Sequence, residues 1–580
     1  MRRNVFIAVA LAFHALAAFT LDDVHYWVGV GENAAGVAIC WEGSTKVWGF
    51  RWNGEANVRD AVSAVVAEDS RLRADDALSA FSYDVFQGAD ALVGGQGFTC
   101  SVAASSSAFP SASAFSPVLL AASVPSDGWI IFRAPSLASY GEPVAAETPY
   151  GWKVVEWATE ATASYNKPAV VLGPPTRSMT VPSIGLPSGA EGEKAGTYVI
   201  SPAYPAWLGG RLFTVSGCDK VEPEEEDADV EAINNFITIE FDHDVVDDPG
   251  NPFGLDFIVF GNSCCSIRTR TSSITPNTNP SDCLLAGTDN GERAVVEVAQ
   301  DKDGPWYGSM KWRTSDGFAP TLGHCYDPEN PDTTLYAGNE WWGAPTNPTY
   351  PVDPRVDFLD CDGLTLAELC RRYNGSAGGT GYDLADAIDE DGNELPADAA
   401  HGGRKWFRYV KISCTSEKKY DEDGDWDGDW LSSEPEVDAV ADVAPVSGYR
   451  NWVLDNFTWD KAWQTNLTAA GVISPNGLPN GLNCAYGLAP TDTATANVPF
   501  KVMSFEPGDA EHVMTMLSPT QMTATPNGLV VKETSSLGGG WKSVKPTLVS
   551  SESQGDGTWL NTFTVPKGEG VFFKFALDAE

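Results

Sequence analysis

The chain has 580 residues, 43% of them hydrophobic and 20 of them tryptophan, so it can form several hydrophobic cores and is not an intrinsically disordered protein. Its formal net charge of −42 would repel phosphate backbones and anionic lipid headgroups, which argues against nucleic-acid and membrane-surface binding. The acidity has two readings, solubility outside the cell or binding of hard cations such as calcium through carboxylate oxygens.

Residues 1–17 have the features of a secretory signal peptide. Arg2 and Arg3 precede an apolar run from Val5 to Leu16, and small residues at Ala15 and Ala17 form a cleavage site. This run is too short to span a bilayer securely, and no later run is long enough to form a transmembrane helix. We therefore predict an exported protein, secreted or held at the cell surface, without membrane insertion.

Residues 22–150 are predicted to form a small α+β domain. Strand-like runs at 25–29, 36–41 and 46–52 precede a segment, 58–66, whose apolar residues are spaced as on one helix face. The tryptophans of these runs could stack on sugars, but aromatic residues on neighbouring strands more often form a core, which we expect for Trp27, Trp41, Trp48 and Trp52. The stretch YWVGVGENAAGVAICW with VWGFRWNGEA resembles an N-terminal module of exported bacterial proteins.

Residues 151–450 are predicted to form a β-sandwich around the segment 235–262. Ile237, Ile239 and Phe241 alternate with more polar residues, an acidic turn rich in Pro and Gly follows, and 256–260 is a short apolar run. This pattern predicts two strands joined by a turn.

The order of further motifs in this region, LGPP, DFIVFGN, YDLADAID, RYVKI and EVDAVADV, resembles a β-sandwich module of bacterial cell-surface proteins. That module is similar to the galactose-binding, discoidin-like jelly rolls. The resemblance implies a fold and says little about a ligand, because such sandwiches host many functions. The chain departs from the pattern by its extra cysteines and by an insertion at about 264–289. Residues 451–490 resemble a short helical linker, and 491–580 read as a C-terminal β-sandwich, so the predicted fold class is mainly β and multidomain.

Export makes disulfides the expected state of the 11 cysteines, none of which is in a C-x-x-C spacing. Cys40 and Cys100, both in the first domain, could pair or remain buried thiols. Cys361 and Cys370 are close enough in sequence to staple a local loop.

The strongest candidate for chemistry is a calcium loop. The stretch 423–434 has the D-x-D-x-D-G-x5-E spacing in which alternating carboxylates converge, a glycine allows the turn, and a late glutamate closes the shell. A strand-like segment precedes the stretch, so we predict calcium in a β-loop and not an EF-hand; the alternative is a solvated acidic loop. The predicted ligands are Asp423, Asp425, Asp427, Asp429 and Glu434.

Two other acidic groups are predicted to be turn residues rather than ligands. They are the set Asp383, Asp386, Asp389 and Asp391, and the set Asp242, Asp244, Asp247 and Asp248. His243 lies between two of these acids, and we expect it to be exposed at a strand end.

No nucleophile elbow, zinc-protease motif or phosphate-binding loop occurs in the chain. We therefore predict a non-enzymatic protein that binds a ligand or builds a surface, with an extracellular glycan or a cell-surface protein as partner. The alternative is an extracellular polysaccharide-degrading hydrolase with accessory β-sandwich modules, because paired catalytic carboxylates have no fixed spacing in a sequence.

Overall fold

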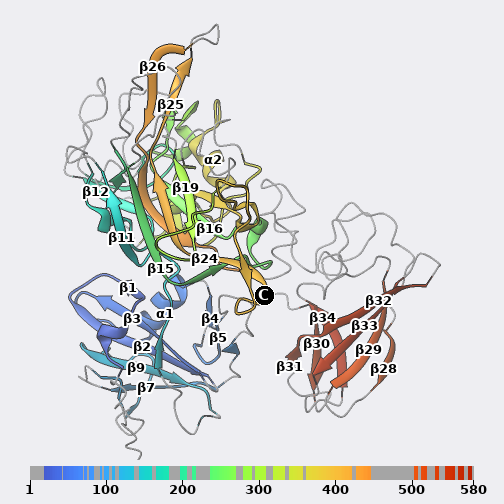
Figure 1. Cartoon of the computed structure of the whole chain (residues 1–580). Helices are drawn as coiled ribbons and strands as arrows, with labels where there is room; N and C mark the ends of the chain where they lie inside the picture. Colours follow the sequence, from blue (N-terminus) through green and yellow to red (C-terminus); the bar gives the residue numbers. More distant parts are fainter. Residues whose placement is uncertain are drawn as a thin grey trace, which may run out of the picture. The chain divides into compact units, whose positions relative to one another are not determined.

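The computed structural model (Figure 1) is described here for the following residues: 19–41, 44–69, 71–74, 77–83, 92–93, 97–103, 108–110, 116–135, 137, 143–159, 165–181, 196–205, 212–216, 235–268, 278–289, 294–308, 318–333, 339–356, 361–420, 426–445, 502–506, 511–518, 529–534, 542–554, 559–566 and 572–577. The protein is mainly β, as predicted. It divides into two compact units, one comprising 1–85 and 89–148, the other 86–88 and 149–580. The predicted signal peptide and the predicted linker at 451–490 lie outside the described residues.

The first unit has a mixed sheet in the order β1-β3-β2-β9-β7-β8, with β10 also paired to β3. A second, antiparallel sheet consists of β4, β5 and β6. The strands of the mixed sheet are β1 (Trp27–Gly29), β2 (Asn33–Trp41), β3 (Ser44–Trp52), β7 (Thr99–Ala103), β8 (Ser116–Pro117), β9 (Gly128–Arg133) and β10 (Pro143–Ala145), and those of the small sheet are β4 (Leu72–Ala74), β5 (Phe81–Tyr83) and β6 (Leu92–Val93).

Helix α1 (Val58–Glu68) begins where the sequence predicts, because Asn57 caps it. The Asn57 side chain accepts from the amide of Asp60, and the Asp60 side chain accepts from the amide of Asn57, which satisfies two amides at the helix start. Trp41, Trp48 and Trp52 of β2 and β3 are buried, and Trp27 is partly buried against a core cluster that includes Ala38, Val47 and Trp129, so the prediction that these aromatics form cores is confirmed.

The central module of the second unit consists of two sheets whose side chains share one core. One sheet has the order β11-β15-β24-β19, with β23 also paired to β24, and the other has the order β14-β27-β16-β22. Their strands are β11 (Lys153–Ala158), β15 (Phe236–Val246), β19 (Val295–Ala299), β23 (Ala397–Asp398) and β24 (Arg404–Ser413), and β14 (Phe213–Thr214), β16 (Phe257–Gly261), β22 (Thr380–Tyr382) and β27 (Glu436–Asp442). The core takes residues such as Ile237 and Ile239 from one sheet and Phe257 and Val440 from the other.

Both strands predicted around the acidic turn form, as β15 and β16. They do not pair with each other, however, because β15 pairs with β11 and β24, whereas β16 pairs with β22 and β27. The turn between them therefore carries the chain from one sheet of the module to the other.

Smaller elements surround the module, each made of short strands or single helical turns. Antiparallel pairs are β12 (Ser178–Val181) with β13 (Gly196–Val199), β17 (Cys265–Ile267) with β18 (Leu285–Asp289), β20 (His324–Tyr326) with β21 (Trp342–Pro345), and β25 (Thr415–Tyr420) with β26 (Trp426–Ser433). The helical pieces are α2 (Leu366–Arg372) and the 3-10 turns η1 (Leu21–Asp23) of the first unit and η3 (Pro168–Val171), η5 (Pro252–Gly254), η6 (Pro280–Asp282) and η8 (Leu384–Asp386) of the second.

The C-terminal part has two antiparallel sheets with a shared small core of Met514, Val531 and Val565. The sheets have the orders β28-β29-β33-β32 and β31-β30-β34. Their strands are β28 (Val502–Glu506), β29 (Glu511–Ser518), β32 (Thr547–Ser553) and β33 (Trp559–Pro566), and β30 (Leu529–Thr534), β31 (Lys542–Val544) and β34 (Phe572–Leu577). This arrangement agrees with the small β-sandwich expected there.

Candidate functional site

A group of titratable side chains that contact one another lies where β15 departs from regular pairing. The pairing of β15 with β24 is interrupted between Glu240 and Val245, and four residues of β15 lie there opposite Arg408 alone. This irregularity is a β-bulge. Asp242, His243 and Asp244 lie in it, and burial still alternates along the strand, so His243 is buried and the two acids, backbone included, are half-buried.

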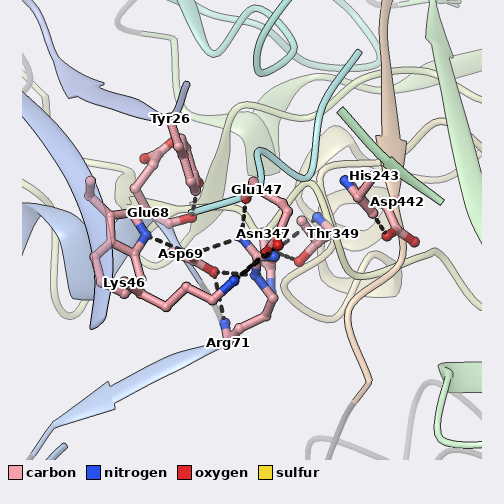
Figure 2. Close-up of polar contacts among 11 residues, drawn as sticks. Tyr26, Lys46, Glu68, Asp69, Arg71, Glu147, His243, Asn347, Thr349 and Asp442 are labelled. Atoms are coloured by element: carbon pink, nitrogen blue, oxygen red, sulfur yellow. Dashed lines mark hydrogen bonds and ion pairs between the residues drawn. The ribbon is translucent and has the colours of Figure 1, made fainter. Parts of the chain in front are cut away.

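His243 lies between the two sheets of the central module and is in contact with a carboxylate on each side. Its Nδ1 lies 2.8 Å from Oδ1 of Asp242. Its Nε2 lies 2.8 Å from Oδ2 of Asp442 on β27, the contact that Figure 2 shows. The ring packs edge-on against Phe241 at 5.8 Å. All three polar side chains are at most 7% exposed. His243 therefore connects β15 of one sheet to β27 of the other.

The charge state of His243 follows from these two contacts. Burial alone would lower the pKa of the imidazole, but the hydrogen bonds to Asp242 and Asp442 and the charges of these carboxylates outweigh it and raise the pKa to about 9. At neutral pH the ring is thus an imidazolium that donates from both nitrogens. Because a general base needs a ring nitrogen that can accept a proton, this arrangement favours a structural contact over acid–base chemistry.

The network continues outward through Arg408, which occupies the position opposite the bulge. Its guanidinium donates to Oδ1 of Asp244 at 2.8 Å and to the carbonyl oxygen of Asp242 at 3.1 Å. The other oxygen of Asp244 lies 3.2 Å from Nε2 of His401. We call the seven residues from Asp442 to Asp398 the histidine–carboxylate network; they are Asp442, His243, Asp242, Arg408, Asp244, His401 and Asp398.

At the outer end of the network, His401 stacks on Trp406 with ring centroids 4.5 Å apart. Its Nδ1 lies 2.8 Å from Oδ1 of Asp398, and the indole of Trp406 donates to the other oxygen of Asp398 at 2.8 Å. These contacts lower the pKa of the Asp398 carboxyl, the hydrogen bond from His401 most strongly. Two histidines that are far apart in the sequence therefore belong to one chain of contacts.

The acidic turn after β15 is held by Asp256, whose side chain is fully buried. Its carboxylate accepts from the amides of Asp248 and Leu384 and from the side chain of Asn251, at 3.2, 2.8 and 3.0 Å. Burial, with the charge of Asp247 as a smaller cause, raises the pKa of Asp256 well above its usual range. Asp256 thus ties the turn to η8.

The acids predicted to be turn residues fall into two groups. Asp383 accepts from the amide of Ala385 at the start of η8, and Asp389 accepts from two amides of its own turn, so this part of the prediction is confirmed. Asp242 and Asp244, in contrast, lie on β15 and bind histidine and arginine. The prediction of a turn role was wrong for these two residues.

The prediction that His243 is exposed was also wrong. We placed it at a strand end, whereas β15 continues to Val246. The sequence does carry a signal for its burial: His243 follows Ile237, Ile239 and Phe241 at every second position, the spacing of one strand face. Reading this alternation two residues further would have placed the ring between the sheets.

The predicted calcium ligands are only partly within the described residues. Asp427 and Asp429 lie on β26, and Glu434 follows that strand, while Asp423 and Asp425 lie outside the described residues. In the part of the chain that the structure describes, no three His, Cys, Asp or Glu side chains are grouped so that they could hold a metal ion. The calcium site stays a prediction.

The cysteines of the first unit are not bonded to each other. Cys40 is a buried thiol that accepts a hydrogen bond from the hydroxyl of Thr45, and burial raises its pKa to about 11. Cys100 is likewise a thiol, on β7, and the strand β9 separates it from Cys40 on β2. Of the two alternatives, a disulfide between Cys40 and Cys100 or separate thiols, the structure favours separate thiols.

The local staple expected between Cys361 and Cys370 was wrong. Cys370 lies on the buried face of α2, where burial and, to a smaller degree, the nearby Cys325 and Cys283 raise the pKa of its thiol. Cys361 precedes the helix and contacts Cys265. Helix α2 starts between the two cysteines, and it directs them to different neighbours.

Among the helices of the described residues, none is both long and apolar enough to cross a membrane. Comparisons with protein-family models, with curated proteins and with solved structures found no match to this chain.

Proposed function

We propose that this chain is an exported, non-enzymatic protein that binds a ligand or builds a structure at the cell surface or outside the cell. The observation that carries the proposal is that the titratable side chains around His243 and Asp256 bind one another and nearby backbone amides. Both nitrogens of His243 are engaged by carboxylates, and the buried carboxylate of Asp256 accepts from the protein itself. Side chains that bind one another in this way stabilise a scaffold, and their hydrogen-bonding groups are not available to a substrate.

The remaining features support a binding role rather than identify a ligand. The described residues form small β modules, which present loops and sheet faces on a rigid frame. The charge of −42 favours an extracellular glycan or a cell-surface protein as partner over nucleic acid.

Calcium is the cofactor that we propose for the stretch 423–434. The acids Asp423 and Asp425 belong to the five residues that connect the paired strands β25 and β26, and Glu434 follows directly after β26. All five predicted ligands thus belong to one pair of strands and the residues next to it, so this site would not need the flanking helices of an EF-hand. A cation bound only by the folded state would raise the stability of the module in proportion to its occupancy.

Thermal unfolding of the purified chain with calcium and with EDTA tests the cofactor. We expect millimolar calcium to raise the melting temperature, and Asp425→Ala to abolish this rise. The matched control is Asp389→Ala, because Asp389 is an exposed turn acid outside the loop and its variant should keep the calcium response. An unchanged melting temperature for the unmodified chain would contradict calcium binding.

A glycan array with calcium and with EDTA tests the proposed role, together with an assay for release of reducing sugars from the same glycans. We expect binding of one glycan class without turnover. Turnover would support the hydrolase and overturn the proposal, and binding to surface proteins alone would redirect it to a protein partner.

A further inference from the structure

Two buried cysteines far apart in the sequence meet in the part of the second unit that contains β17, β18 and α2. The sulfur of Cys361 lies 2.9 Å from the sulfur of Cys265, the first residue of β17, and 3.8 Å from the carbonyl oxygen of Ala286 on β18. Both cysteines are at most 5% exposed and belong to one hydrophobic core. Because 96 positions of the chain separate them, chain connectivity does not impose this contact.

The backbone around the two sulfurs is fixed by main-chain hydrogen bonds. The segment 363–366 runs beside β18, with the amide of Leu285 donating to the carbonyl of Leu364 at 2.8 Å and the amide of Leu366 donating to the carbonyl of Cys283 at 2.8 Å. On the other side, the amide of Cys265 donates to the carbonyl of Pro202 at 2.7 Å. These hydrogen bonds fix the backbone on both sides of the sulfur contact, so the two sulfurs meet without movement of a loop.

We propose that Cys265 and Cys361 form a structural disulfide that joins β17 to the turn before α2. This pairing goes beyond the proposed function, since the geometry that carries it does not depend on any ligand. The surrounding core contains only short two-stranded sheets and one short helix, and small cores of this kind commonly rely on disulfides in exported proteins. The second unit already holds one disulfide, at Cys414.

The reaction requires an oxidant from outside the chain, which we take to be a disulfide-bearing oxidant such as glutathione disulfide or a disulfide oxidoreductase. The thiolate of one cysteine attacks the oxidant, which releases one thiol and leaves a mixed disulfide. The second cysteine then attacks this mixed disulfide, forms the S–S bond and releases the second thiol. The two cysteines lose two electrons and two protons, and the oxidant gains them.

Burial determines when this bond can form. An oxidant must reach at least one sulfur, and neither is accessible in the folded module, so oxidation belongs to the folding stage. For the same reason, a reductant should break the bond slowly in the native protein and rapidly in denaturant. This difference separates a buried structural disulfide from an exposed, redox-active one.

Peptide mapping of the full chain tests the pairing. The reduced, unfolded chain is refolded with a mixture of reduced and oxidised glutathione, and remaining thiols are alkylated at acidic pH. Proteolysis and tandem mass spectrometry without reduction should then give a peptide pair linked through Cys265 and Cys361. A link from Cys361 to Cys264, Cys370 or another cysteine, or an alkylated Cys361, would overturn the proposal. Calcium and glycan binding are not measured in this experiment, so its failure would leave the proposed function standing.

Variants give a second measurement with a matched control. We expect Cys265→Ser and Cys361→Ser to lower the melting temperature of the oxidised chain, and the double variant to lower it no further, because one bond is lost in each case. Cys264→Ser, which changes the adjacent residue, should keep the link. Additive losses in the double variant would show two independent thiols and contradict the disulfide.

Discussion

The contact of His243 with two carboxylates makes a quantitative prediction about stability and pH. The pKa of this histidine is raised from 6.5 to about 9 in the folded protein. Since one pKa unit corresponds to about 1.4 kcal/mol, the difference of roughly 2.5 units contributes about 3 kcal/mol to the free energy of unfolding. The contribution is of the order expected for a buried ion pair that also carries hydrogen bonds.

The sign of the effect follows from the direction of the shift. A group with a raised pKa binds its proton more tightly in the folded state, so its contribution is fully present below pH 6.5 and is lost as the pH rises through about 9. We therefore expect the stability of the central module to fall by about 3 kcal/mol over this interval. Below pH 6.5 the histidine itself adds no further pH dependence.

Hydrogen exchange measured by mass spectrometry can follow this change locally, which matters in a chain of several modules. Protection of peptides from β15 and β27 should decline between pH 6.5 and 9, after correction for the intrinsic exchange rate. His243→Gln should lower protection at pH 6 and remove most of the decline. The control is His324→Gln, because burial lowers the pKa of His324 and its variant should retain the decline. Equal pH profiles for the unmodified chain and His243→Gln would refute the reasoning.

Two further predictions concern the first unit. Asp69→Ala should lower the free energy of unfolding by about 3–5 kcal/mol, because it removes the counter-ion of the buried Arg71 guanidinium, which lies 2.8 Å from Asp69 (Figure 2). The control Asp362→Ala removes an exposed ion pair and should lower it by under about 1 kcal/mol. Equal losses for the two variants in urea unfolding would contradict this interpretation. Gly49→Ala should cost about 1–3 kcal/mol, because an added Cβ would lie 2.2 Å from the ring of Trp27, and an unchanged melting temperature would show that the ring moves freely.

Local pattern predicted the strands of this protein better than it predicted their partners. The alternation of Ile237, Ile239 and Phe241 with more polar residues identifies β15, because a strand with one buried face alternates apolar and polar residues. The apolar run before Gly261 identifies β16, because a strand buried on both faces can be apolar throughout. The turn between them is compatible both with a hairpin and with a crossing between sheets. What decides the outcome is the pairing of β15 with β24 and of β16 with β27, which involves residues at least 160 positions away.

The candidate site was missed for the same reason. The acidic stretch that contains Asp242 and Asp244 predicts a turn, whereas both residues lie on β15. The contacts of Asp244 and His243 depend on a bulge opposite Arg408 and on Asp442 in the opposite sheet. Neither partner can be chosen from the sequence alone among 79 acidic and 37 basic residues.

Long-range contacts of this kind also have a consequence for folding specificity. His243 and Asp442 are separated by 199 positions and belong to different sheets, so they meet only if both sheets have their native register. A shift of β15 by one residue would turn the imidazolium away from Asp442 and place Asp242 or Asp244 against the core. Because an unpaired buried charge costs several kcal/mol, the shifted sandwich is strongly disfavoured, whereas an apolar residue at position 243 would tolerate it better. We therefore expect the buried charges to contribute to the choice of a single sheet packing as well as to its stability, and His243→Leu to relax that choice even if it preserves the melting temperature.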